Sequence, residues 1–307
     1  GCTVERTPPM KRFTAFVQSH KSLVYALCLL GLIAMALVLR LYKLDKIPQG
    51  IHYDEAALSY NAWCINQYGT DGYGNPMPLY PQNLDSGQCP FATYAVALFY
   101  RLFGRSLFVL RLPMALFGTL VVLFGTLILK ESFGRKVSLI GGLLMNILPY
   151  FIMHSRFMLD CNCMLMVMTV AFYLLMRGIK TKKRLLLLLS GLCYGLVLYT
   201  YGLSFGMVPI FLLLAAVYLL TVRAVRWKDA PAFVLPILLL AIPCILFVAI
   251  GYFQWDPIET PLFTINNITR AQAASLRLYV IPRNLKVIFR YMLLKDFLPF
   301  NAIDGYY

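Results

Sequence analysis

Asp54 and Glu55 are neighbouring carboxylates that follow the first long apolar segment of the chain. Only 13 of the 307 residues are acidic, so an acidic pair is a rare feature of this sequence. An ionised carboxylate close to a bilayer is costly unless a partner or a function offsets that cost. It can act as a general base, and Asp54 can equally cap a helix over about 56–66, with Glu55 in its first turn. The two roles are compatible, so the pair is the first candidate for catalysis.

The elements around this pair are membrane spans. The chain is 60% hydrophobic, with 14% aromatic residues and a mean hydropathy of +0.70. Its uncharged stretches are too long and too many for one water-soluble core. We predict an all-α polytopic membrane protein with about seven spans, over 22–43, 111–130, 137–153, 160–178, 185–201, 204–222 and 231–252.

Many of the 28 lysines and arginines behind the net charge of +15 lie in short loops between these spans and in the amino-terminal arm. Such loops are typical of cytoplasmic connections in membrane proteins, and this placement argues against a nucleic-acid partner. The basic groups are Arg6, Lys11, Arg12 and Lys21; Lys130, Arg135 and Lys136; Arg177, Lys180, Lys182, Lys183 and Arg184; and Arg223, Arg226 and Lys228.

All three basic loops fall on one side only if residues 86–100 do not cross the bilayer. This segment is short and is followed by Arg101 and Arg105, which suits a helix lying on the membrane surface. The opposite, non-cytoplasmic face then carries the loop 44–110, the turn 154–160 and the segment 253–307. We therefore expect one multi-pass module in the cell membrane, with surface helices in its first external loop.

This topology gathers polar residues from distant parts of the sequence at one face. They are His52, Asp54, Glu55, His154, Arg156 and Asp160. The alternative for residues 154–156 is a helix end whose side chains reach the interface without a further role. The convergence favours a functional site on the non-cytoplasmic face.

Several short motifs occur in a fixed order along the chain. They are Asp54-Glu55, the stretch 68–78, Ser86-Gly87-Gln88, Leu102-Phe103-Gly104, Arg111-Leu112-Pro113 and the stretch 155–160. With these motifs the chain resembles the GT-C superfamily of membrane glycosyltransferases, in the branch of the protein O-mannosyltransferases and bacterial aminoarabinose-type transferases. Family members continue with further spans, so the resemblance implies an amino-terminal part of a longer protein.

The resemblance implies transfer of a sugar from a polyprenyl-phosphate-linked donor to a glycan, lipid or protein acceptor. Asp54 would be the general base, Glu55 its catalytic neighbour, and the reaction would invert the anomeric configuration. Arg111 and Arg156 would keep Asp54 ionised or contact the lipid phosphate. We also expect Arg156 and Asp160 to form one unit, because they are four residues apart.

The sequence departs from the aminoarabinose-type members at one position. Those members place a lysine in the first loop, whereas this chain has Gln88 within Ser86-Gly87-Gln88-Cys89-Pro90. Phosphate binding would then fall to arginines elsewhere in the chain, or this branch would use different contacts. The carboxyl-terminal segment offers basic candidates, with anionic lipid headgroups as their alternative ligand, and the resemblance brings Asn301 and Tyr306 near the substrate. The basic candidates are Arg270, Arg277, Arg283, Lys286 and Arg290.

Two other functions remain open on the sequence. One is a transporter or flippase of lipid-linked sugars, although the spans contain few of the charges that carriers use. The other is a transferase in which His52, Asp54, Glu55 and His154 bind a divalent metal. Our main prediction needs no cofactor. Cys64 and Cys89 share the first loop and are either a disulfide or two free thiols.

Overall fold

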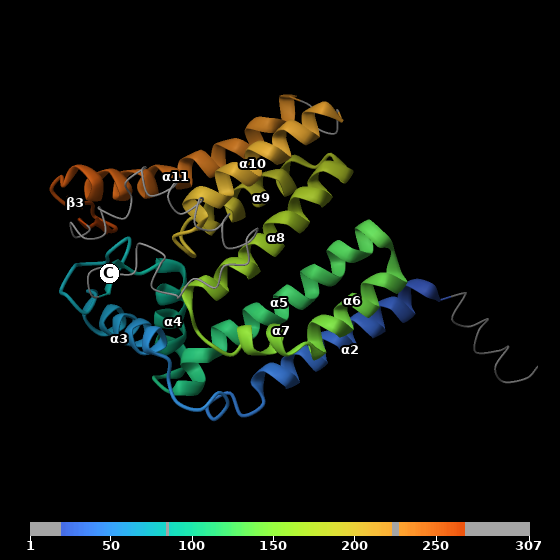
Figure 1. Ribbon diagram of the computed structural model, residues 1–307, viewed down its shortest axis with the longest axis horizontal. Coiled ribbons are helices and arrows are strands. Elements are labelled where there is room, and N and C mark those ends of the chain that lie inside the picture. The colour runs from blue at the N-terminus through green and yellow to red at the C-terminus, as the bar shows by residue number, and fades with distance from the viewer. Residues whose placement is uncertain (1–19, 84–85, 223–226, 268–307) are drawn as a thin grey trace, which may run out of the picture.

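The computed structural model describes residues 20–83, 86–222 and 227–267 and is predominantly helical (Figure 1). Within these residues, five helices are long and apolar enough to cross a membrane. They confirm the prediction of a polytopic membrane protein. These helices are α2 (Lys21–Leu41), α5 (Leu107–Phe133), α8 (Asp160–Thr181), α10 (Ser204–Thr221) and α11 (Ala230–Phe253).

Two further predicted spans correspond to shorter helices. α9 (Arg184–Val197) ends before the turn that leads into α10. The span expected over 137–153 is not continuous, because it consists of α6 (Arg135–Ile147) and α7 (Pro149–His154). Leu148 is extended between them, since a residue before proline avoids the helical region. The total of seven spans therefore stays a prediction.

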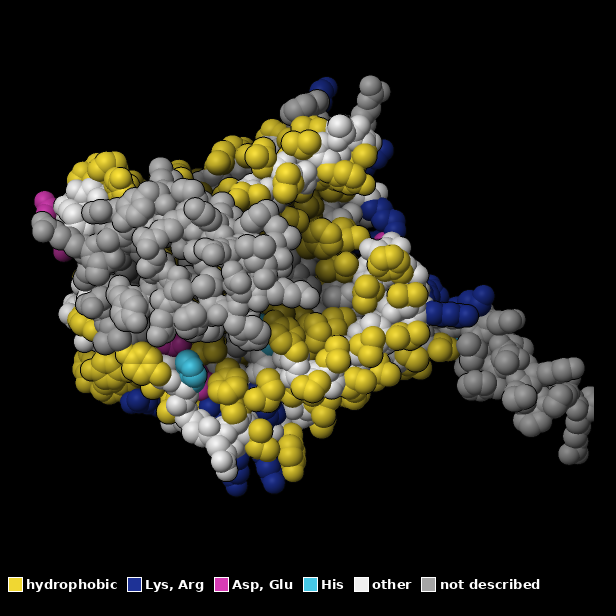
Figure 2. Space-filling view, in the orientation of Figure 1, with side chains coloured by type: hydrophobic (Ala, Val, Ile, Leu, Met, Phe, Trp, Pro, Cys, Tyr) yellow, Lys and Arg dark blue, Asp and Glu magenta, His cyan; other side chains and the backbone are white. Residues whose placement is uncertain are grey.

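The long helices run side by side in two groups (Figure 1). α2 and α6 pack on α5, and α9 and α11 pack on each other beside α8. α5 and α8 are in contact, so they join the two groups. The loops between α5 and α6 and between α8 and α9 lie at the right-hand end of the helices in Figure 1, and Figure 2 shows Lys and Arg side chains on that side, with others along the lower edge of the molecule. The residues around Asp54 lie at the other end.

The first loop contains the helices that the sequence placed there. α3 (Tyr53–Tyr68) packs on α4 (Pro90–Phe103), and α4 packs on α5. The short strands β1 (Gln82–Asn83) and β2 (Ser86–Gly87) form a hairpin before α4. At 14 residues, α4 is too short for a span, in agreement with the expected surface helix.

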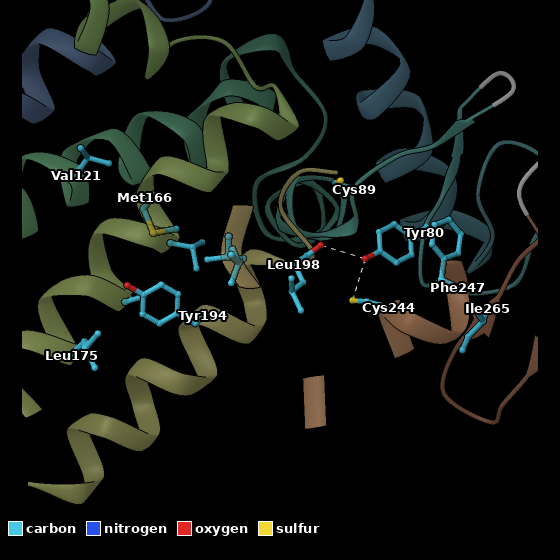
Figure 3. Packing of buried hydrophobic residues seen from close by; sticks show 14 of the residues in the cluster. Tyr80, Cys89, Val121, Met166, Leu175, Tyr194, Leu198, Cys244, Phe247 and Ile265 are labelled. Atoms are coloured by element: carbon cyan, nitrogen blue, oxygen red, sulfur yellow. Dashed lines mark hydrogen bonds between the residues drawn. The ribbon is translucent and has the colours of Figure 1, made fainter. Parts of the chain in front are cut away.

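An aromatic cluster connects this loop to the last helices. The Tyr80 ring stacks on Phe247 with centroids 4.1 Å apart, and its hydroxyl lies 3.3 Å from the Leu198 carbonyl and 3.2 Å from Cys244 Sγ (Figure 3). Backbone bonds join Leu79 to Thr264, beside the hairpin of β3 (Ile258–Glu259) and β4 (Thr264–Ile265). The short helix η1 (Trp227–Asp229) lies at the far end, before α11.

Candidate active site

The amino terminus of α3 fixes the positions of the acidic pair. His52, and not Asp54, is the N-cap, which corrects the cap predicted from the sequence. Its Nδ1 accepts a hydrogen bond from the Asp54 amide (3.2 Å), and its own amide donates to Glu55 Oε2 (3.1 Å). This reciprocal capping box satisfies two amides of the first turn. Glu55 is in the first turn, as predicted, at the third helical position.

The carboxylate of Asp54 is accessible at the amino terminus of α3. Its side chain is 51% exposed, and the half-exposed His52 places Nδ1 3.5 Å from Asp54 Oδ2. Because this Nδ1 already accepts from the Asp54 amide, the contact is not an ion pair in the neutral form of the imidazole. The helix amino terminus favours the negative charge of Asp54. The carboxylate is thus held in position by the backbone but has an accessible acceptor.

Glu55, the other half of the pair, is completely buried. It accepts two hydrogen bonds from Arg111, from Nε (3.0 Å) and Nη2 (2.9 Å), and one from the Met158 amide (2.9 Å). Arg111 also donates to the carbonyls of Leu44, Pro48 and Gly50. All five Arg111 donors are therefore occupied. This geometry makes Glu55 and Arg111 an anchor between α3, α5 and the turn before α8.

Arg156, like Arg111, is buried and donates to several backbone carbonyls. It does not contact Asp160 among the described interactions, so the predicted pair of these two residues is wrong. The Arg156 guanidinium donates only to backbone carbonyls at and beyond the end of α2. Because these carbonyls have no partner within the helix, the arginine caps its carboxyl terminus. Burial and the nearby Arg111 lower the pKa of Arg156. The accepting residues are Leu39, Arg40, Tyr42, Lys43 and Ile47.

Asp160 instead contacts the first loop. It is the first residue of α8, and its Oδ2 accepts a hydrogen bond from the Cys89 amide (3.2 Å), which caps α4. The hydrogen bond from the Met158 amide to Glu55 Oε1 (2.9 Å) brings the turn before α8 to the amino terminus of α3. Asp54 and Asp160, more than one hundred residues apart in the sequence, thus lie at helix amino termini that this contact joins. Burial raises the pKa of the Cys89 thiol, so this neighbour is a neutral group.

Gln88 belongs to a buried polar network in the first loop. Its Oε1 accepts from Asn61 Nδ2 (3.1 Å) and Thr93 Oγ1 (3.3 Å). Asp71 organises the adjacent loop by accepting from three amides and from the Asn75 side chain. Gln88 is 4% exposed, so its contacts are with the protein.

Of the other predicted site residues, His154 has no described contact with the acidic pair, and the rest are outside the described part of the chain. His154 ends α7, stacks obliquely on Tyr150 and has a pKa lowered by burial, with no contact to Asp54 among those described. Several expected ligands lie outside the described residues: Tyr306, Asn301 and the basic candidates Arg270, Arg277, Arg283, Lys286 and Arg290.

The alternative metal site is not assembled by its predicted ligands. Within the described ranges, no group of three or more His, Cys, Asp or Glu side chains is arranged to hold a metal ion. Glu55 is occupied by Arg111, which is the physical reason that it does not join His52, Asp54 and His154. Cys64 and Cys89 are free thiols, so the disulfide alternative is wrong.

Sequence reasoning did not identify Arg40, which is completely buried in α2. It lies inside the predicted span 22–43, and a charge within a span is a signal of function or of a specific partner. The network of Asn61 and Asp71 was also missed, although Asp71 belongs to the motif stretch 68–78. A buried acid in a turn sequence cannot be distinguished from an exposed one without the fold.

A family model described as dolichyl-phosphate-mannose-protein mannosyltransferase matches residues 87–250, more than half of the chain. No curated protein sequence matches the chain. The fold is similar to crystal structures of ArnT from Cupriavidus metallidurans in the apo state (TM-score 0.56, 74% of this chain) and bound to undecaprenyl phosphate (TM-score 0.53, 76%). Both are 18% identical, and the chain spans 42% of their length. The chain therefore belongs to the dolichyl-phosphate-mannose-protein mannosyltransferase family, and its described part has the ArnT-like GT-C fold.

Proposed function

We propose that this protein transfers a sugar from a polyprenyl-phosphate-linked donor to an acceptor, with Asp54 as general base. The observation that carries the proposal is the contrast within the acidic pair. Glu55 is sealed against Arg111, whereas Asp54 is half exposed at a fixed helix amino terminus. An accessible, positioned carboxylate is what a base needs to reach an acceptor hydroxyl or amine.

The reaction would proceed by direct displacement. Asp54 takes the proton of the acceptor, the acceptor atom forms a bond to the anomeric carbon, and the bond to the lipid phosphate oxygen breaks. The phosphate leaves with the electron pair, and the anomeric configuration inverts. Asp160 starts α8, directly after the turn that contacts Glu55, and we assign it the role of orienting a sugar or acceptor hydroxyl. Family membership and the undecaprenyl phosphate in the ArnT structure support a lipid-linked donor.

An apolar cavity at the same end of the bundle suits part of a lipid chain. It has a volume of about 410 Å³ and lies between α9, α10 and α11. Cys244 lines it and contacts Tyr80 of the first loop. The donor phosphate needs positive charge or aligned donors. Because Arg111 and Arg156 are saturated by protein oxygens, we assign this role to neither.

The test is a transfer assay in proteoliposomes with radiolabelled polyprenyl-phosphate sugars and a membrane lipid or peptide acceptor. Asp54→Asn keeps the size of the side chain and removes the proton acceptor, so we expect a 10²–10⁴-fold loss of turnover with normal folded yield. Asp45→Asn is the matched control, because it makes the same change at an exposed acid in the same loop. More than about a tenth of the wild-type rate in Asp54→Asn would overturn the assignment.

The same proteoliposomes separate the transferase from a transporter. A transferase makes a labelled acceptor product, whereas a flippase moves intact labelled lipid across the bilayer and makes no product. We further propose that the site faces the non-cytoplasmic side. Cysteines at the exposed positions Tyr53 and Lys182, in a background without native cysteines, should label from opposite sides with an impermeant maleimide. Labelling of Lys182→Cys from outside would overturn this orientation.

A further inference from the structure

Arg40 is an unusual residue because it buries a full charge inside a membrane-spanning helix. Its side chain is inaccessible, and no acidic group of the described chain lies within ion-pair distance. A buried, unpaired charge is costly and persists only where its hydrogen bonds are satisfied. Its contacts therefore indicate what it does.

The guanidinium joins α2 to the elements that precede α8. Nε donates to Ser155 Oγ (3.1 Å), Nη1 donates to Asn146 Oδ1 (3.1 Å), and Nη2 donates to the Met145 carbonyl (3.3 Å). Asn146 in turn donates to the Leu32 carbonyl of α2 (3.0 Å). Arg40 thus connects α2 with α6 and with the turn that starts at Ser155.

The turn also donates hydrogen bonds back to α2. Arg156, next to Ser155, donates to the carbonyls at the end of α2, including that of Arg40 itself (3.1 Å). The backbone of α5 leaves room for the contact only because residue 118 is glycine. A Cβ at Gly118 would overlap Ser155 Oγ and lie 3.1 Å from Arg40 Nε. The two arginines therefore bind α2 and the turn to each other in both directions.

The turn leads into Asp160, the first residue of α8. Within the same turn, the amide of Met158 donates a hydrogen bond to the carboxylate of Glu55, the neighbour of Asp54. We propose that Arg40 is a positioning residue of the active site: through Ser155 it holds the turn 155–159, and thereby sets the position of Asp160 relative to Asp54. This inference rests on the proposed function for its catalytic consequence and on the structure alone for the anchoring.

The test compares Arg40→Met, Arg40→Lys and Ser155→Ala. Methionine removes the charge with a side chain of suitable length, and such replacements of buried charges are often tolerated. Lysine keeps the charge but cannot reach the serine, the amide and the carbonyl together. Tyr25→Phe is the control, since it removes a hydrogen bond between α2 and α6 (3.2 Å to Ser138) away from the turn.

Two measurements are made on each purified protein. The first is hydrogen exchange, where we expect faster exchange over 155–162 and unchanged exchange over 170–181 in the three variants. The second is transfer kinetics, where we expect kcat to fall about tenfold or more with KM for the labelled donor within about twofold, because misplaced groups lose rate. Tyr25→Phe should leave both measurements unchanged.

Unchanged exchange over 155–162 in Arg40→Met would overturn the anchoring. Faster exchange with an unchanged kcat would overturn the positioning role. If neither Arg40 variant folds, Ser155→Ala decides by the same two criteria, since it keeps the other contacts of the guanidinium. If the wild-type protein transfers no sugar, the proposed function fails, and the exchange measurement still decides whether Arg40 anchors the turn.

Discussion

The two ends of the helix bundle hold their charges in different ways. At the Asp54 end, Glu55, Arg40, Arg111 and Arg156 are buried, and each makes several hydrogen bonds to groups distant in the sequence. At the basic end, Glu131 pairs with Arg177 (2.9 Å) and Lys180 (2.6 Å), and Arg184 pairs with Asp229 (2.8 Å). The basic side chains Lys180 and Arg184 are more than 60% exposed, whereas the side chains of their acidic partners Glu131 and Asp229 are 13% and 7% exposed.

The difference follows from solvation. When an exposed charge forms an ion pair, the attraction of its partner only replaces that of water, so the pair contributes little to the free energy of unfolding. A buried ion has lost its water, so removal of one partner leaves a desolvated charge and is strongly destabilising. The Asp54 end therefore uses charge to determine one geometry, whereas the basic end is consistent with orientation in a membrane.

The largest expected effect is at the buried pair. Glu55→Gln should reduce stability by about 3–5 kcal/mol, because Arg111 keeps its charge without a counterion. We would measure folded yield and thermal denaturation in detergent. Glu55→Leu combined with Arg111→Met should cost less than the sum of the single changes, because the buried charge leaves with its partner. Normal stability with lost turnover in Glu55→Gln would instead make Glu55 a catalytic group.

A smaller effect is expected at Arg156. Arg156→Lys keeps the charge, but three donors on one nitrogen replace a fork that reaches five carbonyls, so we expect a loss of about 2 kcal/mol. Arg177→Lys at the basic end is the control. A variant with unchanged thermal stability and weaker donor binding would show that Arg156 contacts the substrate.

The smallest effect is expected at Glu131. Glu131→Gln removes the negative charge that faces Arg177 and Lys180 and should cost at most about 1 kcal/mol, with a smaller difference from wild type at high salt. Thermal denaturation at two salt concentrations checks both statements. A loss as large as that of Glu55→Gln would remove the distinction between the two ends.

The sequence by itself determined the class of the protein. A long apolar segment in a bilayer must pair its backbone groups internally, so composition predicts the helices. The break before Pro149 was not predicted, and the span expected over 137–153 consists of two helices. The acidic pair, the surface helix α4 and the family could also be predicted, because they depend on local motifs. The placing of helix ends on one face also predicted that the starts of α3 and α8 lie close together, and the contact between Met158 and Glu55 agrees with it.

Only the tertiary structure decided what each charged residue does. Asp54 and Glu55 are neighbours with the same charge, and nothing local shows that one is half exposed and the other sealed by Arg111. Arg156 and Asp160 have helical spacing, yet the chain between them turns and each side chain finds a distant partner. Arg40 looks like the end of an apolar span until α6 and the turn at Ser155 surround it. The role of a charge depends on whether water or protein solvates it, and that is a property of the assembled helices.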